Sequence, residues 1–158
     1  MKATKRTGGW LALLLTAAVF TAARIEAAGA VDQERTGAGP FKVVVNPEAG
    51  VSQLPQEELA RIFLGKKTLW ESGSRITPAM IDESHPVAAG FIVAVVRRTV
   101  AQYQAYWKRQ LFSGGGTAPK TFRNSAQVLE YVTKNPGAIG VVEASASDDR
   151  VKVVEVGK

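Results

Sequence analysis

The stretch from Phe41 to Trp70, FKVVVNPEAGVSQLPQEELARIFLGKKTLW, decides the fold that the sequence predicts. It opens with residues 41–45, which are mostly apolar and β-branched, a composition typical of a buried strand. Asn46-Pro47 ends this strand, because proline has no N–H group to donate to a sheet ladder. Pro55 stands where a first helical residue would, and the glutamates after it suit the positive start of a helix.

A short amphipathic helix is predicted after this proline. Leu59, Ile62 and Phe63 lie at positions i, i+3 and i+4, so they form one apolar stripe. Gly65 supplies a residue that readily takes the left-handed conformation at the end of a helix. A basic segment and Trp70 follow as a hook. A strand, a loop, a helix and a hook within about thirty residues form one supersecondary unit with clear boundaries.

A second strand and a long helical segment come next. Residues 75–81 predict the strand, and Pro86 fits a first helical position with Ser84 or His85 in the cap region. The pattern is then helical over residues 87–112, which is longer than most globular helices.

This long segment is expected to divide near Arg98-Thr99. Thr99 and Gln102 have the spacing of a capping box, so a second helix can begin there. The pair Arg97-Arg98 then lies at the end of the first helix, where cations offset the helix dipole. The apolar stripe of the second helix is expected to comprise Tyr103, Tyr106 or Trp107, and Leu111.

The rest of the chain adds one more helix and two strands. Residues 113–117, SGGGT, predict a surface loop, and Ser125 is expected to cap a third helix. Residues 138–142 and 151–156 predict the last two strands. The resulting order, β-α-β-α-α-α-β-β, predicts an α/β fold with a small sheet flanked by helices.

The first forty residues are expected to lie outside the folded domain. Residues 1–30 have the order of a secretory signal peptide: basic residues, an apolar run and a small-residue cleavage site. Residues 31–40 predict a flexible extension, and residues 41–158 form the domain. The mature protein is therefore expected in the periplasm, where it would fold without disulfides because the chain has no cysteine.

The charge of the mature chain argues against nucleic-acid binding. The signal peptide carries four of the 20 basic residues and one of the 14 acidic residues. The mature chain then has 16 basic and 13 acidic residues, a net charge of about +3. It shows no dense stripe of Lys and Arg with interleaved aromatic residues, which is the usual sign of a nucleic-acid surface.

Nothing in the sequence assembles an enzyme site, a metal site or a cofactor site. His85 is the single histidine, and metal sites need several clustered N, O or S donors. The expected protein is therefore not an enzyme and has no cofactor. The better candidate is anion binding at the helix start over residues 84–88, with Ser84 and His85 as donors and Asp82 accepting a proton from a protonated phosphate.

Several motifs taken together resemble the phosphate-binding proteins of ABC importers. In that family a hinge strand ends in Asn-Pro, a short helix ends in Ile-Phe-x-Gly, a tryptophan follows, and a late strand begins with Pro-Gly-Ala-Ile-Gly. The matching residues are Asn46-Pro47, Ile62 to Gly65, Trp70 and Pro136 to Gly140. The resemblance covers residues 41–143 and implies one lobe of a periplasmic-binding-protein-like fold.

The resemblance also implies a function with two versions. In the first, the protein binds phosphate or another small oxyanion and works with the membrane subunits of an ABC importer. In the second, it is an accessory or protein-interaction module, such as a homo-oligomer, that kept the lobe fold without the ligand. Where the family has an Arg and then Ser-Gly-Thr, this chain has Ile81 and then His85, Pro86 and Val87.

Overall fold

The structure is a computed structural model that describes residues 41–157. The predicted signal peptide (1–30) and N-terminal extension (31–40) lie outside the described residues, as does Lys158. The described residues form six strands, four α-helices, a 3-10 turn (η1) and a π-helical segment (η2). In chain order these are β1 (Phe41–Val45), η1 (Pro47–Ala49), β2 (Gln53–Pro55), α1 (Gln56–Phe63), β3 (Thr77–Ile81), α2 (Pro86–Phe91), η2 (Ile92–Val96), α3 (Val100–Phe112), β4 (Lys120–Phe122), α4 (Ser125–Lys134), β5 (Ala138–Glu143) and β6 (Lys152–Gly157).

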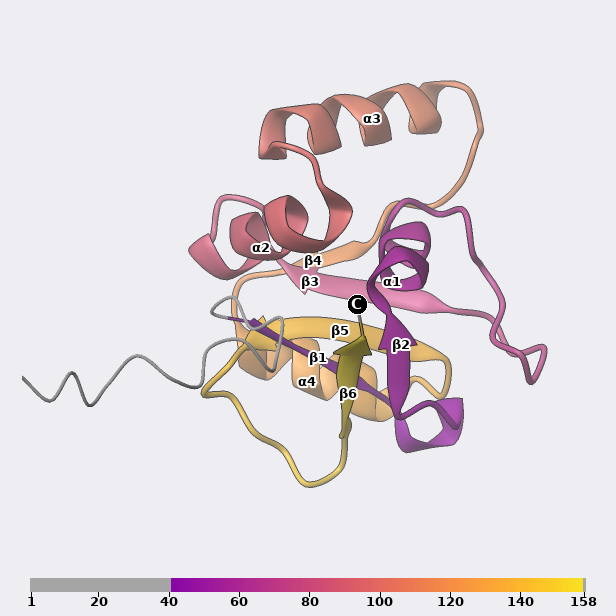
Figure 1. Cartoon of the computed structure of the whole chain (residues 1–158), viewed down its shortest axis with the longest axis vertical. Helices are drawn as coiled ribbons and strands as arrows, with labels where there is room; N and C mark the ends of the chain where they lie inside the picture. Colours follow the sequence, from indigo (N-terminus) through magenta and orange to yellow (C-terminus); the bar gives the residue numbers. More distant parts are fainter. Residues whose placement is uncertain (1–40, 158) are drawn as a thin grey trace, which may run out of the picture. The chain divides into compact units, whose positions relative to one another are not determined.

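The strands form one sheet in the order β2-β6-β1-β5-β3-β4 (Figure 1). β3 is parallel to both of its neighbours, β4 and β5, whereas β1 is antiparallel to β5 and β6. The carboxyl ends of β3, β4 and β5 therefore meet at one edge of the sheet. The prediction of an α/β fold with a small sheet between helices is confirmed.

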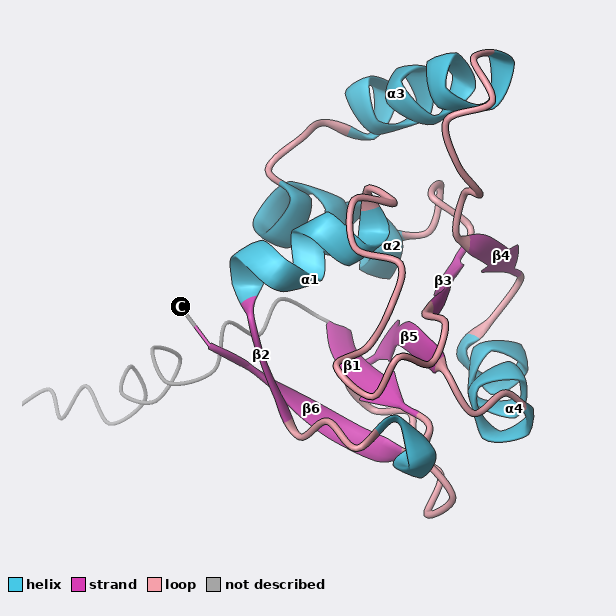
Figure 2. Cartoon of the chain, turned by 90° about the vertical axis from the view of Figure 1, so that its right-hand side faces the viewer, coloured by secondary structure: helices cyan, strands magenta, loops and turns pink. Residues whose placement is uncertain are grey.

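Helices cover both faces of the sheet (Figure 2). α4 packs against β5, β3 and β1 on one face, and α1 and α2 lie on the other. α3 lies beyond α1 and α2, farther from the sheet, and packs against η2. The expected division of the long helical segment is confirmed, because Thr99 and Gln102 form the complete capping box that starts α3.

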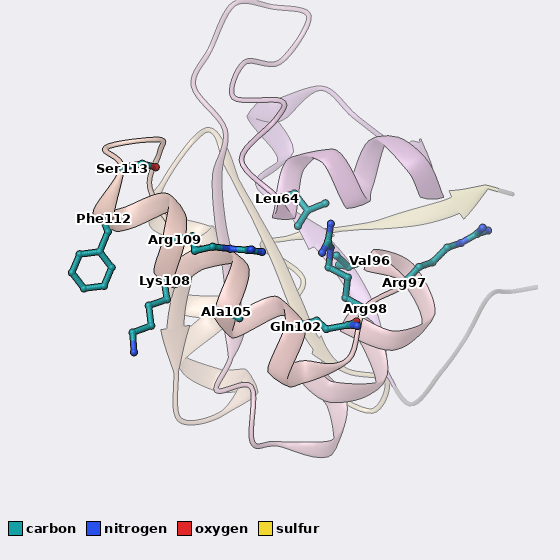
Figure 3. Close-up of a pocket in the computed structure, with 10 residues that line it drawn as sticks. All are labelled: Leu64, Val96, Arg97, Arg98, Gln102, Ala105, Lys108, Arg109, Phe112 and Ser113. Atoms are coloured by element: carbon teal, nitrogen blue, oxygen red, sulfur yellow. The ribbon is translucent and has the colours of Figure 1, made fainter.

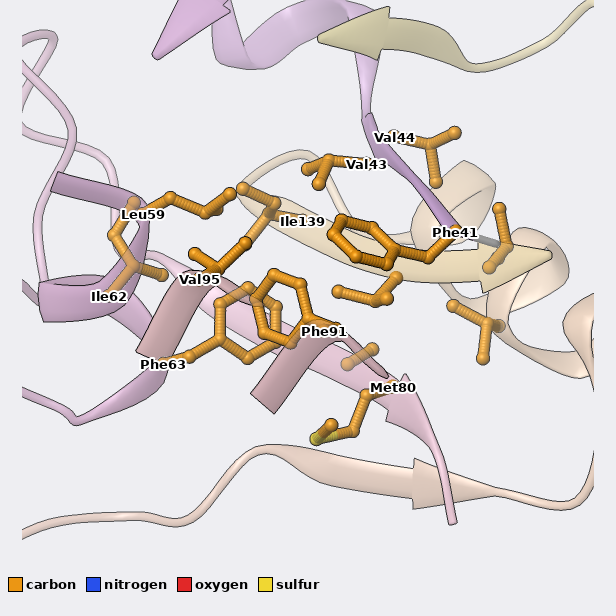
Figure 4. Packing of buried hydrophobic residues seen from close by; sticks show 14 of the residues in the cluster. Phe41, Val43, Val44, Leu59, Ile62, Phe63, Met80, Phe91, Val95 and Ile139 are labelled. Carbon is orange, nitrogen blue, oxygen red and sulfur yellow. The ribbon is translucent and has the colours of Figure 1, made fainter. Parts of the chain in front are cut away.

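The core between the sheet and α1 and α2 is built around three phenylalanines (Figure 4). Phe41 comes from β1, Phe63 from α1 and Phe91 from α2. The ring centroid of Phe91 lies 5.4 Å from that of Phe41 and 4.7 Å from that of Phe63, and both pairs meet edge to face. Such pairs favour this geometry because the positive edge of one ring meets the negative face of the other.

Asn46 joins the opening stretch to the far face of the sheet. Its side-chain amide donates to the carbonyls of Val132 and Thr133 at distances of 2.9 and 3.1 Å. Its side-chain oxygen accepts from the amide of Glu48 at 2.9 Å. The side chain is 5% exposed, so it caps the end of α4 from inside the protein.

Three local predictions were wrong, and two short strands were missed. The two strands β2 and β4 were not predicted, because three residues are too few to show a period. Pro55 is not the first residue of α1 as predicted; it is the last residue of β2, and its ψ of 142° is extended. Asn124, one residue before the predicted Ser125, caps α4 by accepting from the amide of Gln127. Leu111 is 58% exposed and is not part of the buried stripe of α3.

Candidate functional site

The predicted site lies at the edge where the parallel strands end. Asp82 directly follows β3, and its amide donates to the carbonyl of Phe122, the last residue of β4, at 2.9 Å. Glu143 ends β5, the parallel neighbour on the other side of β3. In open α/β sheets, ligands bind outside the carboxyl ends of parallel strands. The fold thus places the predicted residues where such sheets hold their ligands.

Asp82, Ser84 and His85 lie in one turn between β3 and α2. One carboxylate oxygen of Asp82 accepts from the amide of Ser84 at 3.0 Å and from its hydroxyl at 2.6 Å. These two bonds favour the charged carboxylate and lower the pKa of Asp82 below its ordinary value. His85 is the N-cap of α2, since its Nδ1 accepts from the amide of Val87 at 3.3 Å.

This arrangement leaves a small set of groups for an anion. Because Nδ1 of His85 accepts a hydrogen bond, the neutral ring carries its proton on Nε2, which is then a donor. The second carboxylate oxygen of Asp82 is an acceptor. The hydroxyl of Ser84 donates to Asp82 and has to turn away before it can donate to a ligand. Pro86 supplies no amide, so the six-residue α2 offers fewer backbone donors than a longer helix start.

The position before this turn is apolar. Ile81, the residue directly before Asp82, is only 1% exposed and belongs to the core. The turn therefore receives no charged donor from this position. None of the residues Asp82, Ser84 and His85 lines any of four hollows on the surface of residues 41–157.

Sequence reasoning missed the cation that the fold brings to this edge. Arg123 directly follows β4, so it lies at the same edge as Asp82, and its amide donates to the side chain of Gln127 at 3.0 Å. Its side chain is exposed at the start of α4. The only signal that could have found it is the alternation in residues 120–122, which is too short to identify a strand.

Groups of three or more metal-binding side chains are absent from residues 41–157. No helix in the same part of the chain is long and apolar enough to cross a membrane. The single histidine is used as a helix cap, and Ser125, the one buried serine of the described residues, exchanges hydrogen bonds with Glu143.

Solved structures share this architecture. One is a protein from Clostridium perfringens described as a phosphate ABC transporter substrate-binding protein with bound phosphate. Its sequence is 19% identical to this one, and the two structures match with a TM-score of 0.59 over 74% of this chain and 44% of that one. An ABC-type phosphate transport receptor from Vibrio cholerae is 16% identical, with a TM-score of 0.51 over 74% of this chain and 46% of the other. PstS from Borrelia burgdorferi is 15% identical, with a TM-score of 0.52 over 75% and 47%.

These similarities concern the fold, because the sequences are less than 25% identical. The chain spans less than half of the length of each structure that it matches here. The family described as the PBP superfamily domain, where PBP stands for periplasmic binding protein, matches residues 11–157. That match covers nearly the whole sequence and agrees with the resemblance seen in the motifs. The chain belongs to the PBP superfamily domain family.

Proposed function

We propose that this protein is an exported, non-enzymatic binding protein that captures phosphate or another small oxyanion at the turn formed by Asp82, Ser84 and His85. The observation that carries the proposal is the location of the turn at the carboxyl end of β3, which lies between two parallel neighbours. The hydroxyl of Ser84 and Nε2 of His85 serve as donors. Arg123, at the end of β4, adds positive charge to the same edge.

Asp82 has a separate role in this proposal. Its free carboxylate oxygen can accept a hydrogen bond only from a ligand that carries a proton. Monohydrogen phosphate has such a proton at neutral pH, whereas sulfate has none and meets only repulsion. Asp82 therefore selects phosphate over sulfate. Its lowered pKa keeps the carboxylate charged at neutral pH.

The cellular setting is part of the proposal. The predicted signal peptide supports a periplasmic location, and the solved structures that the chain resembles are described as components of phosphate transport. Its partners would then be the membrane subunits of an ABC importer, to which it delivers the anion.

Isothermal titration of the purified protein with phosphate and with sulfate tests the proposal. The expected result is saturable phosphate binding that weakens at least tenfold in Ser84→Ala combined with His85→Ala. Asp82→Asn is expected to bring the affinities for phosphate and sulfate together. No phosphate binding at millimolar ligand, in protein that circular dichroism shows to be folded, would refute the proposal.

A second function is supported by a different surface. Leu111 and Phe112, at the end of α3, are 58% and 84% exposed, although both are large and apolar. Exposed apolar side chains of this size often mark a protein contact. The alternative is therefore an interaction module that kept the lobe fold and recognises a partner through α3.

A further inference from the structure

A groove of about 990 Å³ lies between α3 and the ends of α1 and η2 (Figure 3). Leu64 and Val96 form its apolar floor; they are 8% and 6% exposed. One face of α3 forms a wall with Gln102, Ala105, Arg109 and Phe112, which recur every three or four residues as the helical period requires. This groove shares no residue with the turn around Ser84.

Two tyrosines of α3, the buried Tyr103 and the half-buried Tyr106, tie this helix to the end of α1. Tyr103 donates its hydroxyl to the carbonyl of Phe63 at 3.0 Å, and Tyr106 donates to the carbonyl of Leu64 at 2.7 Å. Both acceptors lie at the end of α1, so α3 is tied to that helix by its own stripe of aromatic residues. Burial raises the pKa of Tyr103, which keeps its hydroxyl protonated as the donor. The spacing between the groove walls is therefore fixed by hydrogen bonds.

Four cations line the groove and no acid does. They are Arg97, Arg98, Lys108 and Arg109. Residues 84–129, which supply every lining residue except Leu64, contain six Lys or Arg and no Asp or Glu. Within residues 41–157, none of the four cations has a carboxylate at salt-bridge distance.

Two of these guanidinium groups converge. In Figure 3, Arg98 and Arg109 extend toward one another beside Leu64. Arg98 is positioned by Tyr106, whose ring centre lies 5.4 Å from the carbon of the guanidinium group. Two like charges directed into one space repel each other unless an anion lies between them. Their planar, forked donors match the two oxygens of a carboxylate.

The size and lining of the groove decide the class of ligand. A volume of about 990 Å³ is that of a site for a large ligand, and a single phosphate would leave most of it empty. The buried floor formed by Leu64 and Val96 accepts an apolar side chain. A peptide presents carboxylates and apolar side chains together, so it can contact the cations and these two residues at once. We propose that this groove binds an acidic segment of a partner protein, with carboxylates on Arg98 and Arg109 and an apolar side chain over Leu64 and Val96.

The proposal is tested with a defined probe, the fluorescein-labelled peptide Glu-Asp-Leu-Phe-Asp-Glu, by fluorescence anisotropy on the purified protein. We expect saturable binding that weakens with added salt and that falls at least tenfold in Arg98→Gln combined with Arg109→Gln. Lys42→Gln combined with Lys152→Gln removes the same charge from β1 and β6 and is expected to leave the affinity within twofold. Arg98→Lys keeps the charge and should still lose several-fold, because the planar fork is lost.

A variant of Arg97 distinguishes an effect on peptide binding from an effect on folding. Arg97 is the one residue other than glycine with a positive φ in residues 41–157, at 56°. Glycine takes this conformation without strain, so Arg97→Gly should keep or raise the unfolding midpoint. In Figure 3 the Arg97 side chain extends away from Arg98 and Arg109, so this variant should weaken peptide binding less than Arg98→Gln combined with Arg109→Gln does. The variants of Ser84 and His85 should bind the peptide as the wild type does, which separates this proposal from the anion site.

Three results would overturn the proposal. The first is no peptide binding at millimolar concentration by folded protein. The second is equal weakening by the control pair on β1 and β6, which would mean attraction by net charge alone. The third is binding to vesicles of phosphatidylglycerol that depends on Arg98 and Arg109 while the peptide does not bind, since that would make a lipid surface the partner.

Discussion

Asn46 is expected to contribute more to stability than any other polar side chain of the opening stretch. It makes three hydrogen bonds from a position that is 5% exposed: two to carbonyls at the end of α4 and one from the amide of Glu48. A hydrogen bond contributes a net stability of about 1 kcal/mol, so Asn46→Ala should lower the free energy of unfolding by about 3 kcal/mol. Urea denaturation followed by circular dichroism measures this change.

Asn46→Asp is the sharper perturbation because it changes the chemistry and keeps the shape. At neutral pH the new carboxylate cannot donate, and it faces two carbonyl oxygens at the negative end of a helix. Asn46→Asp should therefore be less stable than Asn46→Ala at pH 7. Below about pH 4 the carboxyl group becomes protonated and can donate again, so the order of the two variants should reverse.

The sign of this pH dependence follows from linkage. The folded state favours the protonated form of the new carboxyl group, so stability is present at low pH and is lost as the pH rises. Asn135→Ala is a matched control, because its side chain makes one bond, to the carbonyl of Tyr131 within the same helix end. It should cost about 1 kcal/mol at either pH. If Asn46→Asp is as stable as Asn46→Ala at pH 7, Asn46 does not join β1 to α4 in the way described.

Three further predictions concern single sites. Gly65→Ala should lower the free energy of unfolding by about 2–4 kcal/mol, because φ is 67° and a methyl group would lie 2.8 Å from Cη2 of Trp107. The control Gly50→Ala, with φ of 69° and open space around it, should lower it by only about 1–2 kcal/mol. Equal losses of the two variants in urea denaturation would contradict the packing of α3 on the end of α1. Thr77→Val should raise the free energy of unfolding by up to about 1 kcal/mol, since the buried hydroxyl of Thr77 has no hydrogen-bond partner in residues 41–157. A clear loss of stability in urea denaturation would mean that a partner exists. Hydrogen bonds from Arg150 lower the pKa of Asp148 to about 2, so the stability that this pair adds is present above the ordinary pKa of 3.8 and is lost as the pH falls through about 2. In Arg150→Ala, the pKa of Asp148 measured by NMR titration should move back toward its ordinary value. An unchanged pKa would exclude the pair.

Much of the fold could be predicted because its signals are local. The buried strand β1, the apolar stripe of α1 and the left-handed glycine after it are each visible within a few residues. The capping box of Thr99 and Gln102 divides the long helical segment, and both of its hydrogen bonds are present. The order of strands in the sheet is not local, since β1 lies between two strands from the end of the chain.

The candidate site could be predicted only in part. Asp82, Ser84 and His85 are near one another in the sequence, so a turn between a strand and a helix brings them together. Arg123 is distant in the sequence and reaches the same edge only because β4 pairs with β3. The groove could not be predicted, since Arg98 was interpreted only as a cation at a helix end and Arg109 was not singled out. That both line one hollow follows from the packing of α3 against the ends of α1 and η2.

The most direct test of the proposed function is a phosphate titration of the isotope-labelled protein followed by amide NMR. We predict saturable shifts in the turn of Asp82, Ser84 and His85 and at Arg123, and little change in the groove of Arg98 and Arg109. The same shifts should be absent when Ser84→Ala and His85→Ala are combined. Shifts confined to the groove, or no shift at millimolar phosphate, would contradict the claim that this lobe holds an oxyanion at the carboxyl edge of its sheet.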